Sequence, residues 1–250
     1  MSLYRDLCRR MREGEFNYAF SISLKNKYVY VENAKAACTT LKSILGEWEF
    51  AGCKLGSEIP QTFQSNVHVN VLGTPFVKPF QLGEAAFNEI IESENFFRFA
   101  FVRNPYTRLL SAYLDKIVGR RPEAGQIVAE AESLGFEAID GLLSFVDFLK
   151  CVEALAAKGA FLDKHWRPQH HQLYPEAIRY NRIGKVEKLR DDLGGVATEL
   201  GMTANETSRK FGHETRATDQ MQQYYSDEAR ALVARVYKAD FEAFGYDLAL

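Results

Sequence analysis

The sequence predicts an α/β layer fold built around a parallel sheet. Three short runs rich in β-branched or aromatic residues, at about 27–32, 97–102 and 178–183, are each followed by a segment with helical periodicity. Strands that alternate with helices in this way form parallel sheets covered by helices. Ligands of such folds bind at the carboxyl ends of the strands, so we examine the loops after the strands first.

A short loop separates the first strand from the first helix after it. The run "SLKNKYVYVEN" alternates Tyr and Val and predicts a strand at about 27–32. From Thr39 onward the apolar residues fall on one face of a helix: Leu41, Ile44, Leu45 and Trp48. The stretch 52–79 is rich in Gly, Pro and Asn, and it predicts an excursion from the core with a short strand around "VHVNVL".

The second strand repeats this design in "FFRFAFVRNPYTRLLSAYLDKI", after a predicted helix at 83–93. The segment Phe97–Val102 is nearly all apolar, as expected of a strand that is buried on both faces of a parallel sheet. Asn104 can cap the next helix and Pro105 suits its first position. We therefore expect that helix to run to about Val118.

Helical patterns dominate the remainder of the chain. The segments 123–134 and 142–155 have helical spacing, and the third predicted strand, 178–183, is followed by a helix to Leu200. A last amphipathic helix is predicted at 227–244. Without an internal repeat or a convincing linker, the sequence predicts one domain over residues 1–250.

The composition excludes several classes of protein. Of the 250 residues 46% are hydrophobic and 26% charged, and the formal net charge of −2 gives no global attraction to nucleic acid or anionic membranes. No signal peptide or run of about 18 apolar residues is present, so no transmembrane segment is expected. The four cysteines, Cys8, Cys38, Cys53 and Cys151, include no CxxC pair, which argues against a disulfide framework and a zinc site. We expect a cytoplasmic protein that needs no metal.

The loop after the first strand has the character of an anion site. Lys35 precedes small residues that let backbone N–H groups approach a ligand, and two threonines stand where the helix dipole favours negative charge. The candidate contacts are Lys35, Ala36, Ala37, Cys38, Thr39 and Thr40. A Walker A motif would place its lysine immediately before the hydroxyl residue, so a magnesium triphosphate site is not indicated. A capped helix with a surface lysine is the alternative.

The loop after the second strand offers a second anion site. Arg103 leaves the strand, and Asn104, Arg108 and Ser111 share one face of the following helix. An arginine and a serine so placed can hold a phosphate by charge-assisted hydrogen bonds. A nucleotide with two separated phosphates would use both loops; otherwise Arg103 is an exposed charge and Ser111 a tolerated small residue.

These segments resemble a known family. "NAKAACTTLK" is similar to the 5′-phosphosulfate loop, and "VRNPYTRLLSAY" to the 3′-phosphate motif, of sulfotransferases that use 3′-phosphoadenylyl sulfate. The likeness to the family-2 type carbohydrate sulfotransferases continues in "HWRPQHHQL", "RIGKVEKLRDDL" and "YYSDEARALVARVYKADFEAFGY". Two departures are Ala37, where the family often has glycine, and Leu173–Tyr174, where the animal enzymes usually have a cysteine. The missing cysteine suits a bacterial, cytosolic member.

The resemblance implies a fold, a donor and a reaction. The fold would be a P-loop NTPase-like three-layer α/β fold with a central, mainly parallel sheet flanked by helices. The donor would lie across both loops: Lys35, Thr39 and Thr40 on its 5′-phosphosulfate, and Arg103 and Ser111 on its 3′-phosphate. The product would be a sulfated carbohydrate or glycolipid. The alternatives are a P-loop-like nucleotide kinase or ATPase and a non-catalytic nucleotide- or saccharide-binding module.

Sulfuryl transfer needs charge stabilisation and a base. Lys35 can stabilise the charge that grows on the leaving oxygen. Among five histidines we favour His68 as the base, because it lies between the two phosphate loops, where the similar heparan 2-O enzymes carry their catalytic histidine. A surface histidine with no role is the alternative. We expect acceptor contacts from "HWRPQ", namely His165, Trp166 and Arg167, and a lid contact from Arg216. The alternative is that His165 supports the fold and that Trp166 is structural.

Overall fold

A computed structural model describes residues 2–51, 66–68, 73–202 and 217–249. Its contacts divide the chain into two compact units, one formed by 1–102 with 173–212 and the other by 103–172 with 213–250. The expected single domain over 1–250 stays a prediction.

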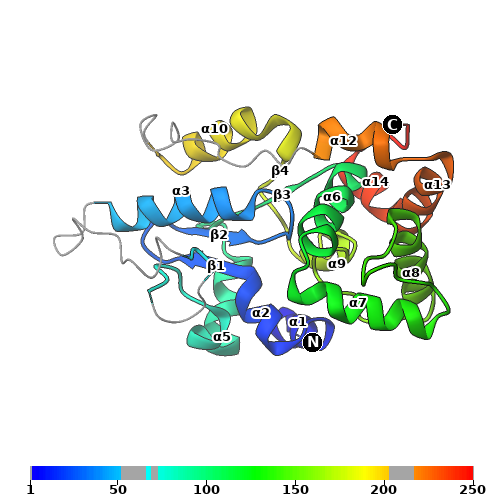
Figure 1. Ribbon diagram of the computed structural model, residues 1–250. Helices are drawn as coiled ribbons and strands as arrows, with labels where there is room; N and C mark the ends of the chain where they lie inside the picture. Colours follow the sequence, from blue (N-terminus) through cyan, green and yellow to red (C-terminus); the bar gives the residue numbers. More distant parts are fainter. Residues whose placement is uncertain (1, 52–65, 69–72, 203–216, 250) are drawn as a thin grey trace. The chain divides into compact units, whose positions relative to one another are not determined.

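The first unit is built on a four-stranded sheet in the order β1-β2-β3-β4 (Figure 1). The strands are β1 (Phe20–Ser23), β2 (Tyr28–Val31), β3 (Phe97–Val102) and β4 (Arg182–Lys185). β1 is antiparallel to β2, whereas β2, β3 and β4 are parallel to one another. Val31 of β2 pairs with Ala100 of β3, so these two central strands end at the same edge of the sheet.

Helices cover both faces of this sheet. α3 (Cys38–Phe50) and α10 (Leu189–Glu199) lie on one face, and α5 (Pro79–Glu92) lies on the other with α1 (Leu3–Arg10) and α2 (Glu13–Ala19) (Figure 1). On the α3 side the packed core contains Tyr28, Tyr30, Leu41, Leu45, Phe99, Phe101, Leu193 and Val196. On the α5 side, Phe16, Phe20 and Phe87 meet edge to face. The result is three layers, as the sequence predicted.

The second unit is helical. Its elements are α6 (Pro105–Ala112), the π-helix η1 (Tyr113–Val118), α7 (Pro122–Ser133), α8 (Phe145–Ala157), α12 (Ala217–Tyr224), α13 (Asp227–Val236) and α14 (Lys238–Phe244). Aromatic side chains fill its core, among them Tyr113, Phe148, Trp166 and Tyr237. The short helices α9 (His170–Leu173), at the boundary between the units, and η2 (Val186–Lys188), before α10, complete the fold.

Several expected elements are confirmed with their bounds. β3 spans the predicted Phe97–Val102, and β2 falls within the predicted 27–32. Asn104 caps α6 by accepting a hydrogen bond from the N–H of Tyr106, with Pro105 at the first helical position.

Other expectations need correction. The third strand lies at Arg182–Lys185 instead of 178–183, because Asn181 hydrogen-bonds to both backbone groups of Arg98 and ends the preceding turn. The last helix is broken at Tyr237, which is not helical (φ −107°, ψ 18°). The short strand expected around "VHVNVL" begins with a turn at 67–68, and its remainder lies outside the described residues.

Candidate donor-binding and catalytic site

The loop between β2 and α3 turns through two left-handed residues. Lys35 has φ 66° and Ala37 has φ 60°, and the N–H of Ala36 between them donates to the carbonyl of Asn33 at 3.2 Å. Ala37 is the N-cap of α3, and no described side chain caps that end. The first amides of α3 are therefore those of Cys38, Thr39 and Thr40. Such a turn next to a helix start is a favourable place for an anion.

Asn33 ties this loop to the neighbouring strand. Its side chain is 1% exposed, and its Nδ2 donates to the carbonyl of Phe101 at 2.9 Å. The bond joins the end of β2 to β3, which leads directly into Arg103. It fixes the start of the loop to the rigid part of the first unit.

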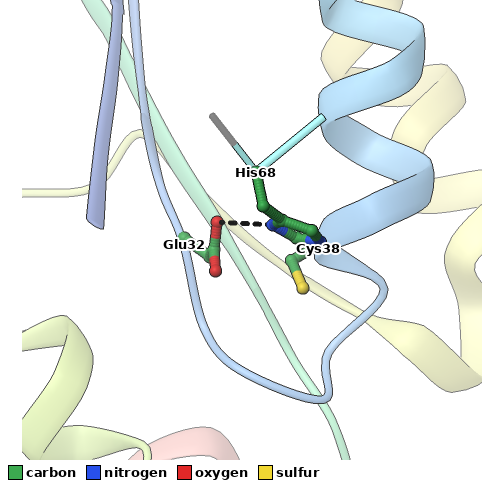
Figure 2. A group of neighbouring side chains, drawn as sticks. All are labelled: Glu32, Cys38 and His68. Atoms are coloured by element: carbon green, nitrogen blue, oxygen red, sulfur yellow. Dashed lines mark ion pairs between the residues drawn. The ribbon is translucent and has the colours of Figure 1, made fainter. Parts of the chain in front are cut away.

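His68 lies beside this loop (Figure 2). Its Nε2 is 3.0 Å from Oγ1 of Thr39, and its Nδ1 is 2.6 Å from the hydroxyl of Tyr18. Nδ1 is also 3.9 Å from Oε2 of Glu32, the residue that follows β2. Glu32 is 5% exposed and forms an ion pair with the buried ammonium of Lys42 on α3. Segments distant in the sequence thus place an imidazole at the start of α3.

Glu32, Cys38 and His68 also form a possible metal group (Figure 2). One ligand atom from each lies within 4.8 Å of the others, and a carboxylate, a thiolate and an imidazole would suit Zn²⁺. However, Glu32 already pairs with Lys42, and both His68 nitrogens are within hydrogen-bonding distance of hydroxyls. A metal would have to displace these contacts. We therefore interpret the group as a hydrogen-bonded acid–base cluster.

Arg103 begins the second unit and is held by a side-chain clamp. Its N–H donates to Oε1 of Gln169 at 2.9 Å, and its carbonyl accepts from Nε2 of the same amide at 2.8 Å. Gln169 is held in turn by Asp240, a fully buried carboxylate that accepts from the N–H groups of Gln169 and His170. The guanidinium donates to Oγ1 of Thr107 at 3.1 Å through Nε. The clamp fixes the backbone of Arg103.

Ser111 has an unsatisfied hydroxyl. The residue is 1% exposed, and its Oγ has no hydrogen-bond partner among the residues that the structure describes. Leaving a buried hydroxyl without a hydrogen bond costs about 1–3 kcal/mol of folding stability.

Arg108, one turn earlier on α6, is also buried. It donates to the carbonyls of Lys164 and Arg167, so it holds the "HWRPQ" segment in place.

The three residues expected to contact an acceptor have unequal environments. His165 is partly buried, and its Nδ1 is 2.6 Å from Oδ1 of Asp163. Burial lowers the pKa of His165, although the Asp163 carboxylate acts in the opposite direction, so the ring favours the neutral form. A contact from His165 to an acceptor stays a prediction.

Trp166 and Arg167 are buried, and their expected contacts with an acceptor stay predictions. Trp166 is 2% exposed, packs edge to face on Phe148 and accepts a backbone hydrogen bond from the hydroxyl of Tyr237. Arg167 is 5% exposed, donates to the carbonyl of Leu162 and lies 3.8 Å from the ring of Phe161. Both side chains pack within the second unit, as the structural alternative for Trp166 predicts.

Comparison with known proteins decides the family. The model of the sulfotransferase family matches residues 18–247 of the chain. The protein belongs to the sulfotransferase family. This confirms the expected P-loop-like α/β class, with a central, mainly parallel sheet flanked by helices.

Relatives of this sulfotransferase include carbohydrate sulfotransferase 11 of Danio rerio, which is 29% identical over 171 residues, 62% of this chain and 48% of the relative. Carbohydrate sulfotransferase 14 of Homo sapiens is 26% identical over 165 residues, 62% of this chain and 43% of the relative. Carbohydrate sulfotransferase 10 of Xenopus laevis is 26% identical over 245 residues, 90% of this chain and 66% of the relative. The chain thus spans about half the length of the first two. No solved structure matches it significantly.

The described residues fit the donor that the sulfotransferase family implies. A left-handed loop with Lys35, followed by hydroxyl side chains, suits a phosphosulfate, and the orphaned hydroxyl of Ser111 lacks the partner that a phosphate oxygen would supply. Arg216, expected to close over the nucleotide, lies outside the described residues, as do His213 and Cys53.

Sequence reasoning missed Tyr18, Glu32, Lys42, Gln169 and Asp240. The position of Glu32 could have identified it as a site residue, because it directly follows a buried strand and such positions lie at the edge of the sheet where ligands bind. Lys42 also carried a signal, since it shares the buried face of α3 with apolar neighbours and therefore needs a partner. Gln169 and Asp240 lie in two of the segments that carry the family resemblance, although no role was assigned to either residue. Tyr18 carried no signal, because its contact with His68 joins segments distant in the chain.

Proposed function

We propose that this protein transfers a sulfuryl group from 3′-phosphoadenylyl sulfate to a hydroxyl of a carbohydrate or glycolipid. The observation that carries the proposal is the 3.0 Å contact between Nε2 of His68 and Oγ1 of Thr39, which puts a candidate base at the anion-binding loop. The names of the relatives support a carbohydrate as the acceptor.

We assign the two ends of the donor to the two predicted segments. The 5′-phosphosulfate is assigned to Lys35, Thr39 and Thr40 with the amides around Ala36, Ala37 and Cys38. The 3′-phosphate is assigned to Arg103 and Ser111. In support, Lys35 and Thr40 are partly exposed and Thr39 is exposed, and the backbone of Arg103 is clamped by Gln169. The donor supplies an activated sulfuryl group, and no metal is expected to take part.

The proposed reaction is a direct displacement at sulfur. The acceptor oxygen forms a bond to sulfur while the bond from sulfur to the bridging phosphate oxygen breaks. The hydroxyl proton passes to a nitrogen of His68, and the negative charge left on the phosphate oxygen is stabilised by Lys35. The products are a sulfate ester and 3′-phosphoadenosine 5′-phosphate, and the proton later returns from His68 to solvent.

The test is transfer of labelled sulfate from the donor to a panel of carbohydrate acceptors by wild type and His68→Ala. A general base contributes about 10²–10⁴-fold, so we expect turnover to fall by that factor while the affinity for 3′-phosphoadenosine 5′-phosphate stays the same. His171→Ala, which removes an exposed histidine, is the matched control and should transfer normally. Unchanged turnover in His68→Ala would remove His68 from the mechanism.

The rival activity is that of a nucleotide kinase or ATPase. It requires ATP binding that depends on magnesium, and the chain lacks the Walker A arrangement for it.

The cytoplasmic location expected from the cysteines stays a prediction. No helix in the described part of the chain combines the length and the apolar character needed to cross a bilayer.

A further inference from the structure

Both ring nitrogens of His68 contact hydroxyl groups, and the two contacts have different consequences. Nε2 faces Thr39 at the start of α3, and Nδ1 faces Tyr18, which comes from α2. A neutral imidazole carries its proton on one nitrogen and accepts on the other. His68 can take a proton at the loop only if its own proton is on Nδ1.

Tyr18 therefore decides which nitrogen can act as the base. If the Tyr18 hydroxyl donates to Nδ1, the proton of His68 is on Nε2, and the nitrogen beside Thr39 is blocked. If the N–H at Nδ1 donates to the Tyr18 oxygen, the phenol must direct its own proton elsewhere. The 2.6 Å separation permits either arrangement.

Glu32 supplies that other acceptor. The Tyr18 hydroxyl is 2.6 Å from Nδ1 of His68 and Oε2 of Glu32 is 3.9 Å from the same nitrogen, so the carboxylate is a nearby group toward which the phenol can turn its proton. Burial, followed by the nearby Glu32 charge, raises the pKa of Tyr18 far above its ordinary value, so the phenol keeps its proton. A carboxylate can only accept. Its Oε2 is 3.9 Å from Nδ1, and this negative charge favours a proton on the near nitrogen.

Lys42 is the ion-pair partner of the Glu32 carboxylate. Its ammonium is 1% exposed, pairs with Glu32 and lies 4.2 Å from the centre of the Tyr18 ring. A buried carboxylate without such a partner would tend to take up a proton and could then donate to Tyr18. With Lys42 in place, donation runs in one direction, from His68 through Tyr18 to Glu32.

We propose that Tyr18 and Glu32 are positioning residues that hold His68 with its proton on Nδ1, so that Nε2 is the nitrogen that receives the acceptor proton. The inference deepens the proposed function and rests on it for its catalytic meaning. After proton transfer, the imidazolium donates from Nδ1 to the same Tyr18–Glu32 pair, whose negative charge stabilises it.

The experiment reads the tautomer directly in the free protein. Long-range ¹H–¹⁵N correlation spectra of protein labelled at histidine separate protonated from unprotonated ring nitrogens, and His68→Ala assigns the His68 signals. We expect wild-type His68 to be protonated on Nδ1. In Tyr18→Phe the proton should move largely to Nε2, and kcat should fall about 10- to 100-fold with donor affinity within about twofold of wild type.

Tyr30→Phe is the matched control. Tyr30 is buried in the same unit, and its hydroxyl has no hydrogen-bond partner within the described ranges, so its removal should leave the tautomer and kcat unchanged. A wild-type His68 protonated on Nε2, or a Tyr18→Phe tautomer identical to wild type, would overturn the inference. The wild-type spectrum tests the inference even if Tyr18→Phe fails to fold, because it shows which ring nitrogen of His68 carries the proton. Full turnover in His68→Ala would instead remove His68 from the proposed mechanism. That outcome is distinct from the tautomer result, because the spectrum reports the tautomer without any turnover.

Discussion

The buried hydroxyl of Ser111 should lower the stability of the free protein and strengthen its binding of the donor. Its buried hydroxyl has no partner within the described ranges, so Ser111→Ala should raise the free energy of unfolding by about 1 kcal/mol. The same change removes a hydrogen bond to a charged phosphate and should weaken binding of 3′-phosphoadenosine 5′-phosphate about tenfold. Denaturant unfolding and calorimetric titration measure the two effects.

Ser133→Ala is the control for Ser111, because Ser133 is exposed and lies at the end of α7. It should leave binding unchanged. A Ser111→Ala protein that is less stable than wild type and binds the nucleotide normally would show that the hydroxyl serves the fold and not the donor.

At the residue scale, local spacing predicted the candidates but not their exposure. Lys35, Arg103 and Ser111 could be named because each stands at a fixed distance from the end of a buried strand. The burial of Trp166 and Arg167 could not be predicted, because the residues that they contact, such as Phe148 and Leu162, are set by tertiary packing.

The loop between β2 and α3, which we propose to bind the phosphosulfate, forms its turn without glycine. Lys35 and Ala37 adopt left-handed φ angles of 66° and 60°, which cost a non-glycine residue about 1–2 kcal/mol each. Glycine at 37 would remove that strain but would lose some backbone entropy on folding. We expect Ala37→Gly to raise the free energy of unfolding by about 0.5–1 kcal/mol, measured by denaturant titration.

Ala36→Gly should change the free energy of unfolding in the opposite direction from Ala37→Gly. Ala36 is fully buried and does not have a positive φ, so glycine at this position would relieve no backbone strain. The greater backbone entropy that glycine loses on folding should lower the free energy of unfolding by about 1 kcal/mol. If both variants lose stability to the same extent, the left-handed turn at Ala37 is not a source of strain.

At the element scale, periodicity predicted most helices and the two central strands. It failed where long-range pairing decides the structure. β1 is a short strand, Phe20–Ser23, that exists because it pairs with β2, and the start of β4 is set by Asn181. The π-helical turn at Tyr113–Val118, closed by a bond from the N–H of Gly119 to the carbonyl of Leu114, has no signature in the spacing of apolar residues.

The stability of the whole molecule should depend on pH through Lys78. Its ammonium is 1% exposed and donates to the carbonyl of Phe20, and burial lowers the pKa of Lys78 from 10.5 to about 7, with the charge of Lys42 adding to the effect. Above pH 7 the folded protein has lost this proton, whereas the unfolded chain keeps it. The unfolded state binds more protons, so stability rises with pH.

Lys78→Met should remove the rise of the free energy of unfolding with pH. Between pH 7 and 9 the free energy of unfolding of wild type should increase by about 2 kcal/mol relative to Lys78→Met, measured by denaturant unfolding at each pH. Lys188→Met changes an exposed lysine of the same unit and should follow wild type. Parallel pH profiles for wild type and Lys78→Met would contradict a depressed pKa.

At the scale of the whole chain, composition and ordered motifs predicted the class of protein. A net charge of −2 meant that any anion site had to be built locally, and the two segments proposed to bind the donor follow β2 and β3, neighbouring parallel strands. The division into two compact units could not be predicted, because no linker or change in composition marks it.

Donor binding tests the central claim most directly. Calorimetric titration of the wild-type protein with 3′-phosphoadenosine 5′-phosphate in the presence of a chelator should show binding, and Lys35→Ala should weaken it while Lys188→Ala does not. ATP with magnesium should bind more weakly than this nucleotide. Binding of ATP that requires magnesium, with no binding of 3′-phosphoadenosine 5′-phosphate, would contradict the account.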